Sequence, residues 1–309
     1  MILGPTATGK SDLAVVLAKK FHGEVISADS RQVYRGVDLG SDKVLRDRYQ
    51  VSGVRCQGKT AYFYKGVRHH LLDVASPKRK FSVAQYKKLA EKTIKDIWRS
   101  DKVPIVCGGT GLYIDTLIYD RKLPAVKPNL KLRRSLEKKT AEELFEELKK
   151  LDPKRAGNID RFNKRRLVRA LEIVMETGRS SHSHILENVR MSKYDVFKIG
   201  IAVPAEELRR RIRKRTLQRL RGGVIGEMEN LEKAGVSEKK LDEVSLYYRW
   251  VRPYLRREIN QEKTLELIST KIWQYAKRQM TWFKRDRNIL WIKDYREAEK
   301  AARKFLQQD

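Results

Sequence analysis

A glycine-rich segment between a short apolar strand and an amphipathic helix constrains the fold more than any other feature. Residues 4–11 fit the pattern GxxxxGK[ST] and follow Ile2-Leu3 directly. In such a loop successive backbone N–H groups converge on an anion, the lysine adds a full positive charge, and the serine hydroxyl can bind Mg²⁺. The segment predicts a di- or triphosphate site, although it leaves the phosphate compound open. Its residues are Gly4, Pro5, Thr6, Ala7, Thr8, Gly9, Lys10 and Ser11.

Short apolar strands alternate with helices over the first 120 residues. Strands are expected at 25–28 and 103–107, and Ser82 with Gln85 forms a capping box that opens a helix between them. This alternation predicts a parallel sheet that is covered by helices.

The middle of the chain has a different composition. From about residue 123 to residue 188, helical segments rich in Lys and Arg replace the strands, which return at 196–203 and 289–292. We therefore predict an α/β fold, a P-loop NTPase-like parallel sheet flanked by helices. Its core comprises residues 1–120 and 190–309, and an all-helical domain is inserted at 121–189.

The charge of the chain indicates an anionic partner. Lys and Arg number 69 against 39 Asp and Glu, a net charge of +30, which exceeds what solubility requires. Nucleic acid is the expected partner, and a generally basic protein is the alternative. The 40% of hydrophobic residues excludes a disordered chain.

Cysteine content and hydropathy narrow the class further. The two cysteines, Cys56 and Cys107, form no CxxC pair, which excludes a disulfide framework and a cysteine-based zinc site. No apolar run approaches the roughly 18 residues of a membrane span. We expect a cytoplasmic protein without membrane contact.

Two polar segments follow predicted strands and should reach the same edge of the sheet. Asp29 ends the second strand, where it can act as a general base or a magnesium ligand, or else cap the next turn. Arg31 and Gln32 can form bidentate hydrogen bonds with phosphates or base edges. The segment 108–113 places Thr110 where an ordinary ATPase has an aspartate, which weakens a plain ATPase interpretation.

These segments together resemble the tRNA dimethylallyltransferases, also called tRNA isopentenyltransferases. The matching segments occur in family order along nearly the whole chain: residues 4–11, 27–34, 108–113, 169–172, 211 with 215, and 275–283. The resemblance implies transfer of a dimethylallyl group from its diphosphate to N6 of the adenosine 3′ to the anticodon. That adenosine would be flipped out of the stack.

The resemblance also implies roles for individual residues. Asp29 matches the general base, Thr110 the residue that orients the amine, and Arg215, with Lys10, the groups that neutralise the departing diphosphate. The diphosphate would be bound by Gly4, Thr6, Ala7, Thr8, Gly9, Lys10 and Ser11, with Ser11 also holding Mg²⁺. The resemblance implies that the inserted helical domain at 121–189 binds tRNA at its anticodon arm. The segments that match tRNA contacts contain Asp29, Ser30, Arg31, Gln32, Arg165, Arg166, Arg169, Tyr248 and Arg249.

Three departures and two alternatives accompany this interpretation. Asp42-Lys43 lacks the proline that usually follows the lysine in the family, and the segment 177–180 lacks another expected proline. Tyr247 stands where the family has a glycine before Tyr248-Arg249, which puts the backbone course there in question. A small-molecule or nucleotide kinase would explain the phosphate loop alone, and a non-catalytic RNA-binding module would explain the charge alone. The expected partners are the anticodon stem-loop of tRNA and dimethylallyl diphosphate, and the chain is expected to act as a monomer.

Overall fold

The chain forms two compact units in the computed structural model. The structure describes residues 1–47, 55–56, 59–119, 124, 126–178, 180 and 194–307. The first unit contains Met1–Ile114 and Asp195–Asp309, and the second contains Asp115–Tyr194. The predicted limits of the helical insertion, 121 and 189, lie inside the second unit. No helix among the described residues has the length and apolar character needed to cross a membrane.

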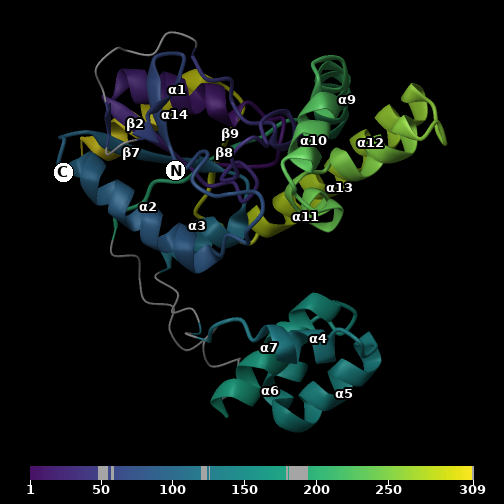
Figure 1. The fold of residues 1–309 in the computed structure, drawn as a ribbon. Coiled ribbons are helices and arrows are strands. Elements are labelled where there is room, and N and C mark those ends of the chain that lie inside the picture. Colours follow the sequence, from purple (N-terminus) through teal and green to yellow (C-terminus); the bar gives the residue numbers. More distant parts are fainter. Residues whose placement is uncertain are drawn as a thin grey trace. The chain divides into compact units, whose positions relative to one another are not determined.

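A seven-stranded sheet of order β5-β6-β2-β7-β1-β8-β9 is the centre of the first unit (Figure 1). All neighbouring strands are parallel except β5 and β6, which form an antiparallel edge hairpin that the sequence analysis missed. The parallel, helix-flanked core is confirmed. The strands are β1 (Ile2–Leu3), β2 (Gly23–Ser27), β5 (Tyr62–Tyr64), β6 (Val67–His70), β7 (Val103–Gly108), β8 (Ile199–Ile201) and β9 (Leu290–Ile292); β3 (Arg55–Cys56) and β4 (Lys59–Thr60) pair separately.

The helices next to the sheet lie on both of its faces (Figure 1). Leu13 and Ala14 of α1 and Ala298 of α14 share one apolar core with Ile2 of β1 and Val25 of β2. The predicted capping box of Ser82 and Gln85 is present at the start of α2. These helices are α1 (Lys10–Lys20), α2 (Val83–Trp98), α3 (Gly111–Ile118) and α14 (Tyr295–Leu306).

A group of five helices lies between β8 and β9 in the sequence. Leu208, Ile212, Thr216 and Leu220 form the buried stripe of α9, which leaves most of its eight Lys and Arg residues off that stripe. The five helices are α9 (Ala205–Arg221), α10 (Val224–Lys233), α11 (Glu238–Val244), α12 (Tyr248–Leu255) and α13 (Gln261–Phe283). In the described residues 28–47, which follow β2, the regular element is a single 3-10 turn, η1 (Leu39–Ser41).

The second unit is helical in its described part. Leucines of three helices form its core, and Thr140 with Glu143 makes a capping box at the start of α5. The Glu172 carboxylate is fully buried and accepts hydrogen bonds from Arg133, at 2.7 Å to each of its oxygens, and from Arg169. Burial alone would raise the pKa of Glu172, but these hydrogen bonds outweigh it and lower the pKa. The helices are α4 (Leu130–Leu136), α5 (Ala141–Leu151), α6 (Pro153–Ala156) and α7 (Lys164–Thr177).

Candidate functional site

The phosphate loop joins β1 to α1, as the sequence predicts. Gly9 is the N-cap of α1 with φ 94°, and a Cβ there would lie 2.7 Å from the Tyr295 hydroxyl, which donates a hydrogen bond to Gly9 O. Thr8 is buried, and its hydroxyl donates to Pro5 O at 2.9 Å. The loop therefore lies at the positive end of the α1 dipole. It is stabilised by the internal Thr8–Pro5 hydrogen bond and by the bond from Tyr295 of α14.

Lys10 is the cation at this loop without a carboxylate partner. Its ammonium lies 2.5 Å from Pro5 O, and none of the carboxylates in the described residues forms an ion pair with it. Burial lowers the pKa of Lys10 from 10.5 to about 8. A partly buried ammonium without a carboxylate partner favours binding of an anion, which would supply the missing counter-charge.

Asp29 and Thr110 are brought together by the pairing of β2 with β7. Ser27 is paired with Cys107, Ala28 N donates to Cys107 O at 2.8 Å, and Thr110 N donates to Ala28 O at 3.1 Å. Gly108 permits this approach, because a Cβ there would lie 2.3 Å from Ala28 O. The two predicted catalytic residues are therefore adjacent at the carboxyl ends of neighbouring strands.

The Asp29 carboxylate serves the local turn with one oxygen. Its Oδ1 accepts the Arg31 N–H at 2.9 Å, which is the capping role that the sequence left open. Asp29 also lines the pocket described below, so the capping role and a chemical role are compatible. The Thr110 hydroxyl accepts Ser30 N–H at 3.0 Å and lies 3.3 Å from the Ser30 hydroxyl.

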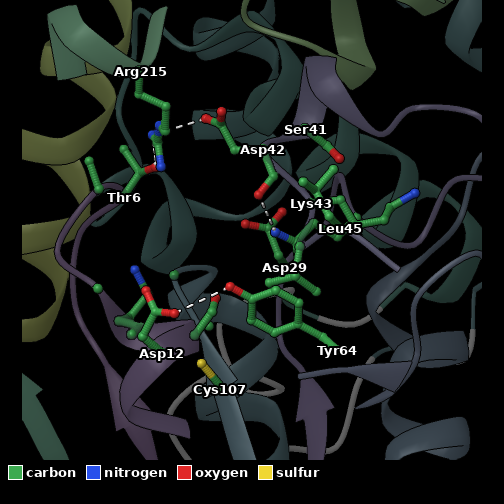
Figure 2. Close-up of a pocket in the computed structure, with 18 of the residues that line it drawn as sticks. Thr6, Asp12, Asp29, Ser41, Asp42, Lys43, Leu45, Tyr64, Cys107 and Arg215 are labelled. Carbon is green, nitrogen blue, oxygen red and sulfur yellow. Dashed lines mark hydrogen bonds and ion pairs between the residues drawn. The ribbon is translucent and has the colours of Figure 1, made fainter. Parts of the chain in front are cut away.

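Arginines of α9 form another wall of the site. Arg215 Nη2 donates to the Thr6 hydroxyl at 2.6 Å and lies 2.9 Å from the Asp42 carboxylate (Figure 2). Arg211 and Arg219, one turn to either side on α9, also line the pocket. Spacing of four residues along a helix places all three guanidinium groups on one face.

Gln279 of α13 links the phosphate loop to the Thr110 turn, a role the sequence analysis did not identify. Its side-chain carbonyl accepts Thr6 N–H at 2.9 Å, and its amide donates to Gly109 O at 2.9 Å. Gln279 is buried, and a Cβ at Gly109 would lie 2.2 Å from its amide nitrogen. The segment 275–283 matches the family, but nothing within it distinguishes a bridging glutamine from any other polar helix position.

These groups surround one pocket of about 430 Å³ (Figure 2). Of the residues predicted for the site in this unit, Gly4, Thr8, Ser30, Arg31, Thr110, Tyr248 and Arg249 do not line it. Burial raises the pKa of the Cys107 thiol to about 11, so this lining group remains protonated at neutral pH. The pocket is lined by Thr6, Ala7, Gly9, Lys10, Ser11, Asp12, Asp29, Gln32, Ser41, Asp42, Lys43, Val44, Leu45, Tyr64, Cys107, Gly108, Gly109, Arg211, Arg215, Arg219 and Gln279.

The residues predicted to contact tRNA differ in accessibility. The prediction is wrong for the Tyr248 side chain, which is fully buried and donates a hydrogen bond to Glu227 at 2.6 Å. Its ring fills the space that a Cβ at Gly40 would need, so it packs as a core residue. Its neighbour Arg249 is exposed. Sequence pattern alone did not separate the buried residue from the exposed one.

The other predicted tRNA contacts lie in both units. Arg165 and Arg166 are exposed on the first turn of α7, whereas Arg169 is committed to Glu172 and Val126 O. In the first unit, Arg31 lies with its guanidinium 4.6 Å from the centre of the Tyr275 ring. The Gln32 amide is held between the Ser27 hydroxyl and Asp42 O.

The donor set suits a magnesium ion that is bound mainly through a substrate. Across the described residues, no three His, Cys, Asp or Glu side chains form a group that could hold a metal by themselves. The pocket does contain the Ser11 hydroxyl and the Asp12 and Asp29 carboxylates. Mg²⁺ prefers such oxygen donors and often takes only one or two ligands from protein, with phosphate oxygens and water completing its shell.

Comparisons with known proteins show which family the chain is similar to. The family described as IPP transferase matches residues 32–286, and the family described as isopentenyl transferase matches residues 1–56. The tRNA dimethylallyltransferase of Alkaliphilus oremlandii is 35% identical over 312 residues, covering 99% of this chain and 95% of that protein.

Solved structures show the same similarity. The full-length tRNA isopentenylpyrophosphate transferase of Bacillus halodurans aligns with a TM-score of 0.67 at 32% identity, over 99% of this chain and 94% of that one. A eukaryotic dimethylallyltransferase acting on tRNA aligns with a TM-score of 0.77 at 25% identity, over 99% and 79% of the respective chains.

The lowered pKa of Lys10 predicts a pH dependence of anion binding. Only the protonated amine supplies charge, so affinity for inorganic pyrophosphate should fall as pH rises through about 8. In the Lys10→Arg variant the cation stays charged, and pyrophosphate's own titration is common to both proteins. Between pH 7 and 9, calorimetry should show that the affinity for pyrophosphate falls about tenfold more in the wild type than in Lys10→Arg. Parallel curves for the two proteins would contradict this role of Lys10.

Proposed function

Because the chain belongs to the IPP transferase family, we infer that it is an enzyme that transfers a prenyl group to tRNA. We further propose that the donor is dimethylallyl diphosphate and the acceptor is N6 of the adenosine 3′-adjacent to the anticodon. One observation carries the proposal: Lys10 of the phosphate loop and the Asp29 carboxylate line the same pocket. A kinase is not favoured, since β7 ends in glycine and is followed by Gly109 and Thr110 rather than by a carboxylate.

The phosphate loop is the proposed diphosphate site. Lys10, the α1 N-terminus and Arg215 supply positive charge where the C–O bond to the diphosphate breaks and its electron pair stays on the leaving oxygen. Ala7, Gly9 and Ser11 line the pocket, while Gly4 and Thr8 shape the loop. Thr6 has its N–H bonded to Gln279 and its hydroxyl to Arg215, so it connects the loop to the other walls.

Asp29 is the proposed general base for the acceptor amine. As the nitrogen lone pair forms the new C–N bond, a proton leaves N6, and Asp29 Oδ2 can take it while Oδ1 stays bonded to Arg31 N. Thr110 orients the same amine. Its hydroxyl accepts from Ser30 N, which holds it at the turn beside Asp29.

Magnesium is the proposed metal, with Ser11 as its protein ligand. When bound, the ion would neutralise negative charge on the diphosphate. The carboxylates of Asp12 and Asp29 lie in the same pocket and can bind the water shell of the ion.

The first turn of α7 supports the proposed tRNA contact of the helical unit. Lys164, Arg165 and Arg166 follow the N-cap Asn163, and the turn contains no acidic residue. Cations at a helix N-terminus oppose the helix dipole, at a cost of about 0.3–1 kcal/mol each. A phosphate backbone bound there would reverse that cost. Arg249, Arg31, Ser30 and Gln32 are the proposed contacts from the first unit. That the enzyme is a cytoplasmic monomer stays a prediction.

Transfer of label tests the reaction and the position together. Labelled dimethylallyl diphosphate, Mg²⁺ and an anticodon stem-loop with the target adenosine should yield labelled RNA. A matched stem-loop with that adenosine replaced should yield none. Equal labelling of both RNAs would contradict the acceptor position, and no labelling of either by folded protein would contradict the proposed reaction.

The Asp29→Asn variant separates chemistry from binding. An amide cannot accept the N6 proton, so kcat should fall by roughly 10²–10⁴-fold. Affinity for the stem-loop, measured by fluorescence anisotropy, should change little because the amide retains the Oδ1 acceptor for Arg31 N. Full activity of this variant would exclude the general-base role, and an equal loss of RNA affinity would assign Asp29 to binding.

The Arg165→Ala variant tests the helical unit as a phosphate-binding surface. The affinity for tRNA should decrease, and the slope of log K against log salt should become shallower by about one. Lys149→Ala is the matched control, because Lys149 is also exposed but lies in the last turn of α5. An unchanged salt slope for Arg165→Ala would exclude a phosphate contact at this position.

A further inference from the structure

Asp42 is a carboxylate inside a site that must bind a highly charged anion. Its Oδ2 lies 2.9 Å from Arg215 Nη2, and its Oδ1 accepts hydrogen bonds from Arg219 Nε at 3.3 Å and from the Tyr247 hydroxyl at 3.1 Å. Figure 2 shows the Asp42 carboxylate and the Arg215 guanidinium facing each other, joined by a dashed line. Such a carboxylate either holds an arginine in place for the substrate or acts as its counter-ion until the anionic substrate displaces it.

The backbone around Asp42 is held by contacts that do not involve the arginine. The neighbouring Lys43 is fully buried, and its ammonium bonds to Tyr34 O at 3.0 Å and to Asp38 and Asp73 at 2.5 Å each. Asp42 has φ 54°, and Asp42 N donates to Leu39 O.

A second anchor comes from α10. The Glu227 carboxylate accepts three successive N–H groups, those of Asp38, Leu39 and Gly40, at 2.7–2.9 Å. Because the loop is anchored from both sides, the position of Asp42 is fixed independently of Arg215.

Tyr247 completes the attachment of the carboxylate. Its side chain is 1% exposed, and burial raises the pKa of its hydroxyl, so the group stays protonated and donates to Asp42. Tyr247 N donates to the Ser245 hydroxyl, which in turn donates to Gly40 O at 2.8 Å. The position where the family has a glycine thus carries a hydroxyl that no glycine could supply.

The geometry at Arg215 favours positioning over occupation. The contacts with Asp42 and Thr6 both use Nη2, whereas Nε is buried and has no hydrogen-bond partner within the described residues. One end of the guanidinium is held. Nη1 forms no hydrogen bond among the described residues and remains as a donor for the diphosphate. A carboxylate that merely occupied the arginine would instead favour the bidentate fork.

We propose that Asp42 and Tyr247 are positioning residues that hold Arg215 in place for the departing diphosphate. This inference rests on the proposed function, because it assigns them a part in the same reaction. They act through Arg215 and touch neither the prenyl group nor the acceptor. Since charge on the leaving oxygen develops in the transition state, loss of alignment lowers kcat more than it weakens donor binding.

The test is a kinetic double-mutant cycle on the full chain with labelled dimethylallyl diphosphate and the stem-loop. Asp42→Asn removes the charge and retains a residue that tolerates positive φ. It should lower kcat about tenfold and change the donor KM less than about threefold. In an Arg215→Ala background the same substitution should lower kcat no further.

One further variant tests Tyr247, and another serves as a control for the double-mutant cycle. Tyr247→Phe keeps the buried ring and should lower kcat about threefold, also without effect in the Arg215→Ala background. Glu262→Gln is the control. Glu262 of α13 pairs at 2.7 Å with Arg213, which lies on α9 as Arg215 does, but Glu262 does not line the pocket. It should leave kcat and KM unchanged.

Other outcomes would overturn the inference. If Asp42→Asn keeps the wild-type kcat and binds inorganic pyrophosphate more tightly by calorimetry, Asp42 is a displaceable counter-ion. If its effect is equally large without Arg215, it does not act through that residue. A wild-type enzyme without transfer activity would overturn the proposed function itself, whereas an active wild type beside a fully active Asp42→Asn variant would overturn this inference alone.

Discussion

The parallel pairing of β1 with β7 and of β7 with β2 is the constraint on which the rest of the site depends. It aligns the carboxyl ends of three strands, so that the phosphate loop after β1, Asp29 after β2 and the Gly108–Thr110 turn after β7 meet at one edge. The fit is close enough that Gly108 leaves no space for a Cβ beside Ala28 O. Helices α9 and α13 then close the pocket with Arg215 and Gln279.

Local pairing, rather than net charge, determines which cations of the pocket are available to an anion. The chain has a net charge of +30, yet Lys43 is neutralised by Asp38 and Asp73, and Arg219 and Arg215 share Asp42. Lys10 alone among these bonds only to a backbone carbonyl. The excess positive charge therefore favours binding of a large polyanion at the surface. The small anion in the pocket is bound by a few oriented groups instead.

Residues that a motif or a strand end defines could be predicted, and residues that act across the chain could not. Lys10 belongs to a contiguous pattern, and Asp29 follows from the rule that strand ends converge. Gln279 acts on Thr6 and Gly109, both more than 150 positions away, and its neighbours in the sequence indicate only an ordinary helix. Tyr248 shows the opposite error, because a segment typical of tRNA contact contains a side chain that packs inside.

The sequence by itself determined the α/β core, the phosphate loop, the helical insertion and the family. These depend on local periodicity, on glycine spacing and on an ordered set of short motifs, all of which can be read from contiguous residues. Only the tertiary structure decided which cations remain unpaired, which tyrosine is buried, and how Asp42, Tyr247 and Arg215 meet. Such contacts join segments about 200 residues apart, and their energies depend on distance and burial, which a linear sequence does not contain.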